Sequence, residues 1–211
     1  MKSYYIHLIR HGEIDETNKG KYIGTTDVPL SAEGVKALKA LDRQFVYPGA
    51  QAVFTSPLKR CRQTCEILYP SLKAIPIDNL SECNFGEWEE KSAEQLKGNP
   101  DFEKWLAGDT EIKPPRGESN SAFTRRICLI FEDIVNGLIK TATTESVIVT
   151  HGGVIMTLLA VYGLPQAKPF DWVMDSGFGY TLRITPMLWQ RDKVAEVCAA
   201  IPSERDCDGE E

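Results

Sequence analysis

Two histidines of the chain stand in the same local setting, although they are far apart in the sequence. His11 lies in "LIRHGE" and His151 in "VIVTHGG", so each follows an apolar run and precedes a glycine. The chain has only three histidines, which makes the repeated setting informative. Imidazole can act near neutral pH as a nucleophile, a proton carrier or a metal ligand. The two His-Gly junctions are therefore the first candidates for a catalytic site.

Two arginines accompany these histidines: Arg10 directly precedes His11, and Arg60 lies in "FTSPLKRCRQT". Guanidinium groups match the oxygens of a phosphate, and helix N-termini near the junctions add N–H groups that attract anions. The set therefore predicts a pocket for a phosphoryl group. Free imidazole has a pKa of about 6.5, so one histidine can attack phosphorus in its neutral form. The other, if protonated, would be one more cation for the transition state.

A metal site is the competing interpretation, because histidine is a common metal ligand. The sequence has no HExxH, HxH or CxxC spacing, and the neighbouring arginines would repel a cation. We therefore expect neither a metal nor another cofactor. A histidine at a strand end can also be purely structural, and for His7 we expect only packing.

The elements that must position these residues follow from the hydrophobic pattern. Strands are predicted over residues 4–9, 52–55, 74–77, 147–150, 180–184 and 194–199, the last two joined by a turn at Asp192-Lys193. Helices are predicted to begin at Ser31, which is a good N-cap, at Ser56-Pro57, after Ser119 or Ser121, and at Val154. On the second of these helices, Cys61 and Cys65 have the spacing of a core face.

Alternating strands and helices predict an α/β fold, here a three-layer α/β/α sandwich with a mostly parallel sheet. We expect a single domain over residues 1–201, with a helical insertion at about 86–118 over the active-site end, and an acidic flexible tail over 202–211. Ligands of such sheets bind beyond the carboxyl ends of the strands. The junctions after residues 9, 55 and 150 should therefore meet at one edge.

Composition limits the partners. The chain has 211 residues, of which 42% are hydrophobic and 26% charged, and a net charge of −6. This charge disfavours nucleic acid and anionic membranes as partners, and no apolar run is long enough to span a bilayer. The first residues look like a core strand rather than a signal peptide. The six cysteines form no compact framework, so we expect reduced thiols and a cytoplasmic location. A homodimer remains open.

Several motifs of the chain resemble those of one family. "LIRHGE", "DVPLSAEG", "FTSPLKRCRQT", "LSECNFGEWEE", "PPRGES" and "VIVTHGG" occur in this order in the histidine phosphatase superfamily, also called phosphoglycerate mutase-like. The resemblance covers residues 4 to 185. One such motif is weak evidence, but six in order identify the chain as a member.

The resemblance implies a role for each candidate. His11 is similar to the nucleophile that becomes phosphohistidine, and Arg10, Arg60 and His151 to the phosphate pocket. Glu82 matches the family's proton donor and must be protonated in the first step. We expect nearby arginines to lower its pKa, and substrate phosphate to raise it again once bound. Glu87 and Glu89 are close competitors for this role, with exposed surface as the alternative for both.

The loop after His11 departs from the family pattern. Members often have Asn six residues after the nucleophile, where this chain has Thr17, followed by Asn18. A hydroxyl contact, a loop shifted by one residue and a lost contact all remain open. We expect the substrate to be bound by residues of this loop and of the second junction: Thr17, Asn18, Tyr22, Gly24, Thr25 and Gly152.

Within the superfamily, "FGEWEE" and "PPRGES" look more like the phosphatases than the mutases, and resemble the alpha-ribazole phosphatases of cobalamin synthesis. This implies a small phosphorylated metabolite as substrate. Phe85 and Trp88 could stack on its base, although packing is the favoured role for Trp88. A phosphoglycerate mutase is the alternative enzyme. A non-catalytic phospho-ligand binding module is disfavoured, because it would be expected to lack some of the five predicted catalytic residues.

Overall fold

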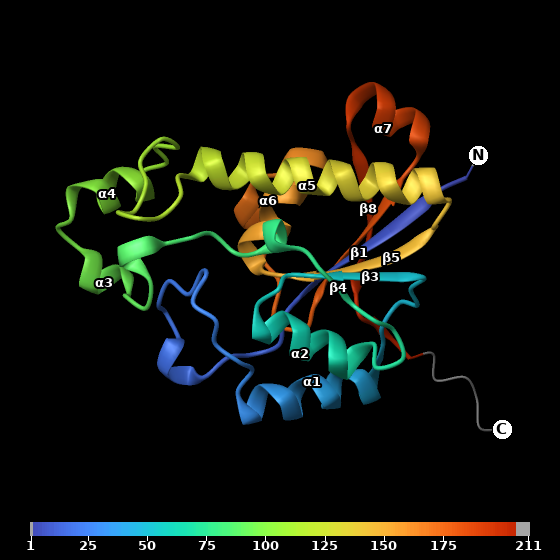
Figure 1. The fold of residues 1–211 in the computed structure, drawn as a ribbon, viewed down its shortest axis with the longest axis horizontal. Coiled ribbons are helices and arrows are strands. Elements are labelled where there is room, and N and C mark those ends of the chain that lie inside the picture. The colour runs from blue at the N-terminus through green and yellow to red at the C-terminus, as the bar shows by residue number, and fades with distance from the viewer. Residues whose placement is uncertain (1, 206–211) are drawn as a thin grey trace.

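A seven-stranded sheet forms the middle of the computed structural model, which describes residues 2–205 (Figure 1). Its strand order is β4-β3-β5-β1-β7-β8-β6. The strands are β1 (Tyr4–Arg10), β3 (Ala52–Thr55), β4 (Ile75–Pro76), β5 (Glu145–Thr150), β6 (Gly163–Leu164), β7 (Gly179–Ile184) and β8 (Ala195–Ile201).

The strands that carry the candidate residues run in parallel. β4, β3, β5 and β1 are successive parallel neighbours, whereas β7 is antiparallel to both β1 and β8. The predicted mostly parallel sheet is therefore confirmed. In the register of β1 with β5, Arg10 is paired with Thr150. The carboxyl ends of β1, β3 and β5 consequently meet at one edge, as the sequence predicts.

Helices cover both faces of the sheet and complete the predicted three layers. In Figure 1, α1 and α2 lie below the sheet and α5 and α6 above it. One core cluster fills the α5–α6 side, and another fills the α1–α2 side, where Cys61 and Cys65 are buried as predicted. These helices are α1 (Ala32–Gln44), α2 (Lys59–Leu68), α5 (Asn120–Thr141) and α6 (Gly152–Tyr162).

Two of the four predicted helix starts are confirmed, and two are shifted. The Ser31 hydroxyl accepts a hydrogen bond from the N–H of Gly34 (2.8 Å), and Ser119, not Ser121, is the N-cap of α5. The helix predicted from Val154, α6, begins already at Gly152. The helix predicted from Ser56-Pro57 begins only at Lys59. Asp27, in a distant loop, accepts the N–H of Lys59 at 2.7 Å and so replaces a local cap.

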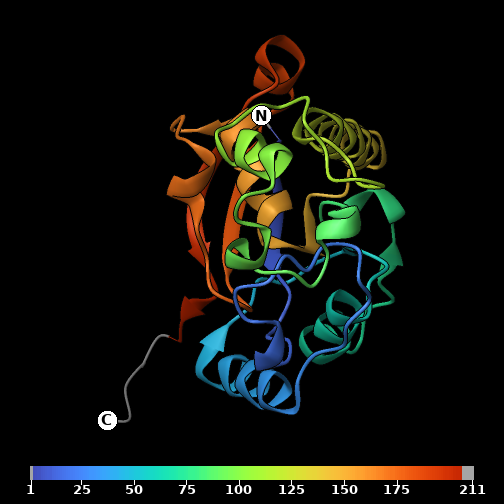
Figure 2. The ribbon, with the colours of Figure 1, turned by 90° about the vertical axis from the view of Figure 1, so that its left-hand side faces the viewer.

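The predicted insertion lies over the carboxyl ends of the parallel strands, and Figure 2 looks onto this end. It contains three short elements, η3 (Gly86–Trp88), α3 (Ala93–Leu96) and α4 (Pro100–Leu106). Trp88, Leu96 and Phe102 are buried together beneath them, in a small core separate from the two main clusters. The insertion therefore has packing of its own.

The C-terminal part differs from the prediction in two places. Instead of a turn at Asp192-Lys193, a helix α7 (Pro186–Asp192) connects β7 to β8, and Lys193 ends it with a positive φ of 53°. The predicted tail also begins late, because β9 (Ser203–Glu204) pairs with β2 (Phe45–Val46). Residues 206–211 of that tail lie outside the described residues. Short 3-10 helices η1 (Glu16–Asn18), η2 (Asp78–Leu80) and η4 (Pro169–Trp172) complete the fold.

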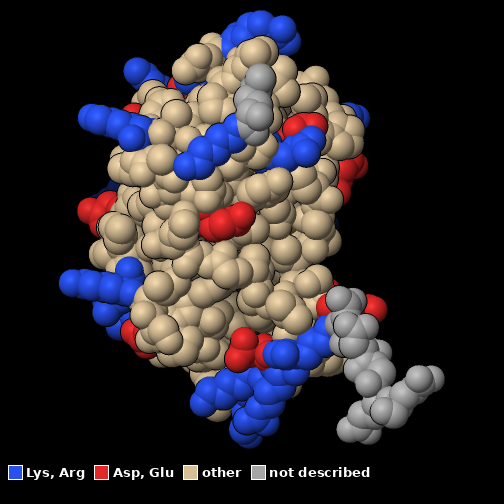
Figure 3. All heavy atoms as spheres, turned by 90° about the vertical axis from the view of Figure 1, so that its right-hand side faces the viewer, with Lys and Arg blue, Asp and Glu red and all other residues tan. Residues whose placement is uncertain are grey.

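The end of the sheet opposite the insertion carries charged side chains of both signs. On the end opposite the insertion, charged side chains lie mainly at the margin, with lysines and arginines gathered on the side of α1 (Figure 3). Arg60, at the insertion end, is the one buried arginine or lysine of residues 2–205. Within the same residues, no helix combines the length and the apolar content that a bilayer crossing needs.

Two glycines test the packing by the same substitution. A Cβ at Gly179 of β7 would lie 1.7 Å from the carbonyl oxygen of Leu8, whereas a Cβ at Gly137 of α5 meets nothing within 4 Å. Gly179→Ala should lower the free energy of unfolding by at least about 3 kcal/mol, because β7 can no longer pair closely with β1. Gly137→Ala should raise it by about 1 kcal/mol through helix propensity. Urea denaturation measures both, and a stable Gly179→Ala protein would contradict the register.

Candidate active site

The N-terminus of α6 brings the two predicted histidines together. His151 directly precedes this helix, and its ring centroid lies 5.1 Å from that of His11, with the rings 67° apart. Both side chains are buried. The positive end of an α-helix favours bound anions at such a position. The meeting of the two junctions at one point is therefore confirmed.

A backbone hydrogen bond sets the tautomer of His11. Its Nδ1 lies 2.7 Å from the carbonyl oxygen of Gly12, which can only accept, so Nδ1 carries the proton. Nε2 is left with the free electron pair that a nucleophile needs. Burial, followed by the positive charge of Arg60, lowers the pKa of His11 to about 3. The imidazole is therefore neutral throughout the physiological pH range.

His151 is neutral as well, for a similar reason. Its Nδ1 accepts a hydrogen bond from the Arg60 Nε at 3.3 Å, so Nε2 carries the proton and donates to the Ser56 hydroxyl at 2.9 Å. Burial lowers its pKa well below the ordinary value, and His11 and Arg60 add to the effect. In this arrangement His151 is therefore a neutral hydrogen-bond donor and not a further cation. Ser56, predicted as a helix cap, belongs to the site instead.

Arg10 approaches the same helix end and has an unused donor. Its Nη1 donates to the carbonyl oxygen of Met174 at 2.7 Å, whereas its Nε is buried and has no hydrogen-bond partner among residues 2–205. The missing Cβ of Gly152 would stand 3.6 Å from this Nε. Buried N–H groups without an acceptor are rare and costly in proteins. The unpartnered Nε therefore marks a place where an anionic ligand can bind.

Arg60 is enclosed by the loop that follows β1. Its exposed fraction is 1%, and its Nη1 and Nη2 donate to the carbonyl oxygens of Thr26 (2.8 Å) and Gly24 (2.6 Å). Burial lowers its pKa, but an arginine remains charged at neutral pH in proteins. The loop carbonyls thus compensate a buried positive charge that lies against His151.

The carboxylate of Glu82 reaches the helix end from the other side. It accepts the N–H of Gly153 and the N–H of Cys83, each at 3.0 Å. A Cβ at position 153 would lie 2.5 Å from Glu82 Oε1, so a residue other than glycine would displace the carboxylate from this position. Burial raises the pKa of Glu82, and the two N–H bonds and the arginines oppose this. Contrary to expectation, the pKa is already raised without a bound substrate.

Glu89 organises the loop that encloses Arg60. Its carboxylate accepts the N–H groups of Gly24 (3.0 Å), Thr25 (2.9 Å), Thr26 (3.3 Å) and Phe85 (3.0 Å), and the hydroxyl of Thr26 (2.6 Å). The interpretation of Glu89 as exposed surface is therefore wrong. The carbonyl groups of the same loop accept hydrogen bonds from Arg60, so Glu89 stabilises the position of Arg60 indirectly, through the loop. Glu87, in contrast, is exposed.

The predicted substrate-binding residues fall into two groups. Gly152 lies beside Arg10, and Gly24 and Thr25 belong to the loop around Arg60. The exposed Thr17, in η1, donates its hydroxyl to Asp15 (2.6 Å), and the backbone of Asn18 closes a turn. Neither side chain has a hydrogen bond to the other predicted site residues in the described structure.

Tyr22 belongs to an aromatic cluster together with Phe85, Trp88, Phe102 and Trp105. Its ring lies 5.1 Å from that of Phe85 and 5.7 Å from that of Trp105. Trp88 is 2% exposed and packs edge-on against Phe102, so packing is confirmed as its role. The cluster joins the loop after β1 to the insertion. His7, in the middle of β1, is buried between Thr181 and Glu145 and also serves packing.

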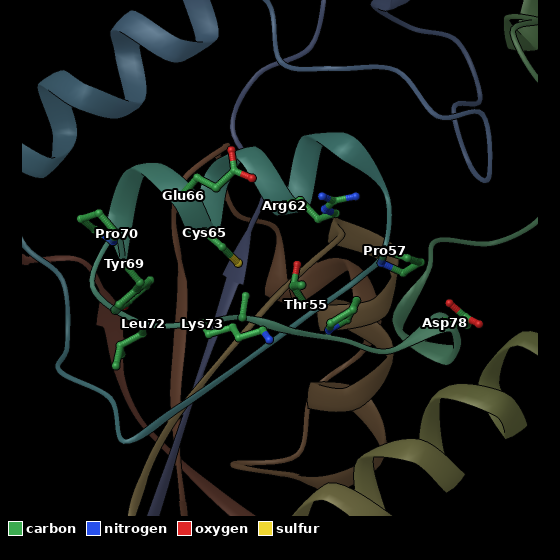
Figure 4. Close-up of a pocket in the computed structure, with 12 residues that line it drawn as sticks. Thr55, Pro57, Arg62, Cys65, Glu66, Tyr69, Pro70, Leu72, Lys73 and Asp78 are labelled. Atoms are coloured by element: carbon green, nitrogen blue, oxygen red, sulfur yellow. The ribbon is translucent and has the colours of Figure 1, made fainter.

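Two cavities lie outside this centre. One, of about 660 Å³, opens between α2 and β4 and has exposed charges of both signs, among them Arg62, Glu66 and Lys73 (Figure 4). None of the five predicted catalytic residues lines it. The other, of about 310 Å³, is lined by Thr25, Asp78, Ser81, Asn84, Gly117, Glu118 and Arg126. It therefore adjoins the segment that carries Glu82.

The arrangement combines a neutral nucleophile, a carboxylic acid and two guanidinium groups around one helix N-terminus. Such a set suits transfer of an anionic group to His11 with proton transfer by Glu82. Ser56 and Glu89 contribute through hydrogen bonds that connect distant parts of the chain. A Ser-Pro pair is an ordinary helix start and a surface Glu is common, so no local signal distinguishes them.

Comparison with known proteins agrees with this geometry. The sequence model described as "Histidine phosphatase superfamily (branch 1)" matches residues 6–196. The adenosylcobalamin/alpha-ribazole phosphatase of Salmonella typhimurium is 29% identical over 178 residues, which cover 81% of this chain and 85% of that protein.

Solved structures share the fold. The alpha-ribazole phosphatase from Shigella flexneri has a TM-score of 0.78 at 24% identity, covering 94% of this chain and 96% of that one. A phosphoglycerate mutase from Thermus thermophilus has a TM-score of 0.66 at 27% identity, covering 93% and 98%. The three-layer architecture is thus common to phosphatases and mutases.

The lowered pKa of His11 predicts a specific acid sensitivity. Between the unfolded pKa of about 6.5 and the folded value, the unfolded state binds a proton that the folded state does not. The folded state therefore loses stability as the pH falls through this window. In His11→Asn, the slope of the unfolding free energy against pH should be shallower by about 1.4 kcal/mol per pH unit. Urea titrations at several pH values measure it, and equal slopes would contradict a buried neutral His11.

Proposed function

The chain belongs to the histidine phosphatase superfamily, branch 1, and on this premise we propose that it hydrolyses phosphate monoesters through a phosphohistidine at His11. The observation that carries the proposal is the hydrogen bond from His11 Nδ1 to the Gly12 carbonyl (2.7 Å), which leaves Nε2 free to attack. The low pKa of His11 supports it, because the nucleophile needs no base to remove a proton.

In the first step, Nε2 of His11 attacks phosphorus and the bond to the leaving oxygen breaks. Glu82, protonated, gives its proton to that oxygen, so the alcohol leaves neutral. The raised pKa of Glu82 favours the acid form that this step requires. Nδ1 of His11 keeps its proton throughout, since it is held by Gly12.

In the second step, water attacks the phosphohistidine and the nitrogen–phosphorus bond breaks. Glu82, now a carboxylate, takes the proton from that water and returns to its acid form. Inorganic phosphate leaves and His11 is again neutral. The two steps balance in protons without any further group.

The negative charge of the transferred group is met by cationic and N–H groups of this chain. The unpartnered Nε of Arg10, the guanidinium of Arg60 and the N-terminus of α6 surround the two histidines. These groups do the work that a metal ion does in other phosphoryl-transfer enzymes. We therefore propose a reaction that needs no metal.

We propose alpha-ribazole 5'-phosphate, or a closely related nucleotide-like metabolite, as the substrate. The relative from Salmonella typhimurium and the solved structure from Shigella flexneri, both alpha-ribazole phosphatases, support this choice. The cavity of about 310 Å³ beside Glu82 also supports it, because Thr25, Ser81 and Asn84 can hydrogen-bond the hydroxyls of a sugar. The five described cysteines are free, which suits the cytoplasm.

A phosphoglycerate mutase is the second candidate, and the structural match to the enzyme from Thermus thermophilus favours it. A mutase returns the phosphoryl group from the histidine to a bound intermediate. It must therefore exclude water from the second step.

Removal of the nucleophile tests the reaction. With p-nitrophenyl phosphate and excess EDTA, His11→Ala should reduce phosphate release at least about a thousandfold, or roughly 4 kcal/mol of barrier. The wild type should keep its activity in EDTA and form an acid-labile phosphoprotein that His11→Ala does not form. Activity abolished by EDTA would instead assign the histidines to a metal.

Substrate choice is tested by a panel of three esters. We expect kcat/KM for alpha-ribazole 5'-phosphate to exceed that for phosphoserine and 3-phosphoglycerate by at least about a hundredfold, because a site with dedicated polar groups rejects ligands that leave them unpaired. Assays with 3-phosphoglycerate are run with and without 2,3-bisphosphoglycerate. If 2-phosphoglycerate appears faster than inorganic phosphate, the mutase is correct.

A further inference from the structure

We infer that Arg126 and Glu118 form a clamp that positions Glu82 for proton transfer, so that Arg126 is a positioning residue of the reaction. The inference rests on the proposed role of Glu82 as the proton donor. Both residues line the cavity of about 310 Å³ beside Glu82, but neither has a hydrogen bond to the histidines or to the predicted phosphate pocket in the described structure. Their influence acts through the backbone on both sides of Glu82.

Arg126 holds the segment that leads up to Glu82. From α5, its Nη1 donates to the carbonyl oxygens of Asn79 (2.9 Å) and Ser81 (3.0 Å), and its Nη2 to that of Glu82 itself (3.3 Å). Three carbonyl groups within four residues are thus bound by one guanidinium. The backbone from 79 to 82 cannot shift without breaking these bonds.

Glu118 completes the clamp from the other side. Its carboxylate accepts two hydrogen bonds from Arg126, one from Nε (3.2 Å) and one from Nη2 (2.5 Å). It also accepts the N–H of Asn84 at 2.9 Å. The pair therefore grips the chain before and after Glu82, and connects α5 to the end of the insertion.

All five N–H donors of Arg126 are used in this arrangement. Lysine has three donors around one point and cannot reproduce the planar fork. The side chains of the pair are 22% and 17% exposed, so solvent does not replace the lost bonds freely. An arginine that served only as a surface ion pair would not need carbonyl partners on the catalytic segment.

The clamp matters because proton transfer depends strongly on position. A misplacement of about 1 Å at the reacting centre can cost a hundredfold in rate. Among residues 2–205, the N–H groups of Cys83 and Gly153 are the only hydrogen-bond partners of the Glu82 carboxylate. If the backbone from 79 to 84 relaxes, these two bonds alone cannot hold the carboxylate at the leaving oxygen.

The test uses leaving groups that differ in their need for a proton. Wild type, Glu82→Gln, Arg126→Met, Arg126→Lys and Glu118→Gln are assayed with 2,4-dinitrophenyl, 4-nitrophenyl and phenyl phosphate. The parameter is kcat/KM, which reports formation of the phosphohistidine. Arg183→Met is the matched control, because Arg183 also makes a bidentate pair, with Glu196 (2.8 Å), between β7 and β8.

We expect Arg126→Met to change the leaving-group dependence of kcat/KM in the same direction as Glu82→Gln, but to a smaller extent. With phenyl phosphate, whose leaving oxygen needs the proton, kcat/KM should fall about a hundredfold in Glu82→Gln and at least about tenfold in Arg126→Met. With 2,4-dinitrophenyl phosphate, which leaves without a proton, both should remain within about threefold of wild type. Arg126→Lys and Glu118→Gln should lie between wild type and Arg126→Met, and Arg183→Met should match wild type for all three esters.

Two results would overturn the inference. If Arg126→Met, Arg126→Lys and Glu118→Gln lower kcat/KM by the same factor for every ester, the pair supports folding only. If Arg183→Met changes the leaving-group dependence as Arg126→Met does, the effect is a general loss of stability. A Glu82→Gln protein with wild-type leaving-group dependence would instead contradict the proposed role of Glu82, and so separates that failure from a failure of the clamp.

Discussion

The parallel register between β1 and β5 is the constraint on which the whole site depends. Arg10 stands opposite Thr150, and the N–H of His11 donates to the carbonyl oxygen of Thr150 at 2.9 Å. The two histidines are therefore the next residues at the ends of neighbouring strands. A strand shifted by one residue would turn its side chains to the opposite faces of the sheet. Helices packed on both faces prevent this shift, so the two main cores also determine the chemistry at the strand ends.

Burial tunes the reacting groups in complementary directions. It lowers the pKa of both histidines, which frees the His11 nucleophile of a proton, and it raises the pKa of Glu82, which supplies an acid. Removal from water always disfavours the charged form, whether that form is a cation or an anion. For Arg60, which is charged and buried, hydrogen bonds to the carbonyl oxygens of Thr26 and Gly24 offset this cost. Positive charge is thereby kept where an anion must bind.

The fold and the meeting of the two histidines could be predicted from the sequence, because the signals for these features are local. An apolar strand followed by His-Gly is visible within about ten residues, and parallel strands must end at the same edge. The role of Glu82 could be predicted only from the resemblance to the family, because its hydrogen-bond partner Gly153 is 71 residues away in the sequence. Ser56, Glu89 and Arg126 act through tertiary hydrogen bonds that no local pattern encodes. α7 was missed although Pro186 is a helix-start signal, because its seven residues are too short for a clear periodicity.

The aromatic cluster around Tyr22 suggests how related proteins can acquire different insertions on the same sheet. The insertion carries a core of its own, in Trp88, Leu96 and Phe102, and meets the rest of the chain through Tyr22 and the Glu89 carboxylate. A segment that stabilises itself can exchange its sequence with little disturbance to the sheet beneath it. Apart from Glu89 and Glu118, which hold segments of the reaction centre, the part that covers this centre can therefore evolve under separate pressures. In this way the catalytic core can be inherited unchanged, while changes in the insertion alter the range of phosphate esters that the enzyme accepts.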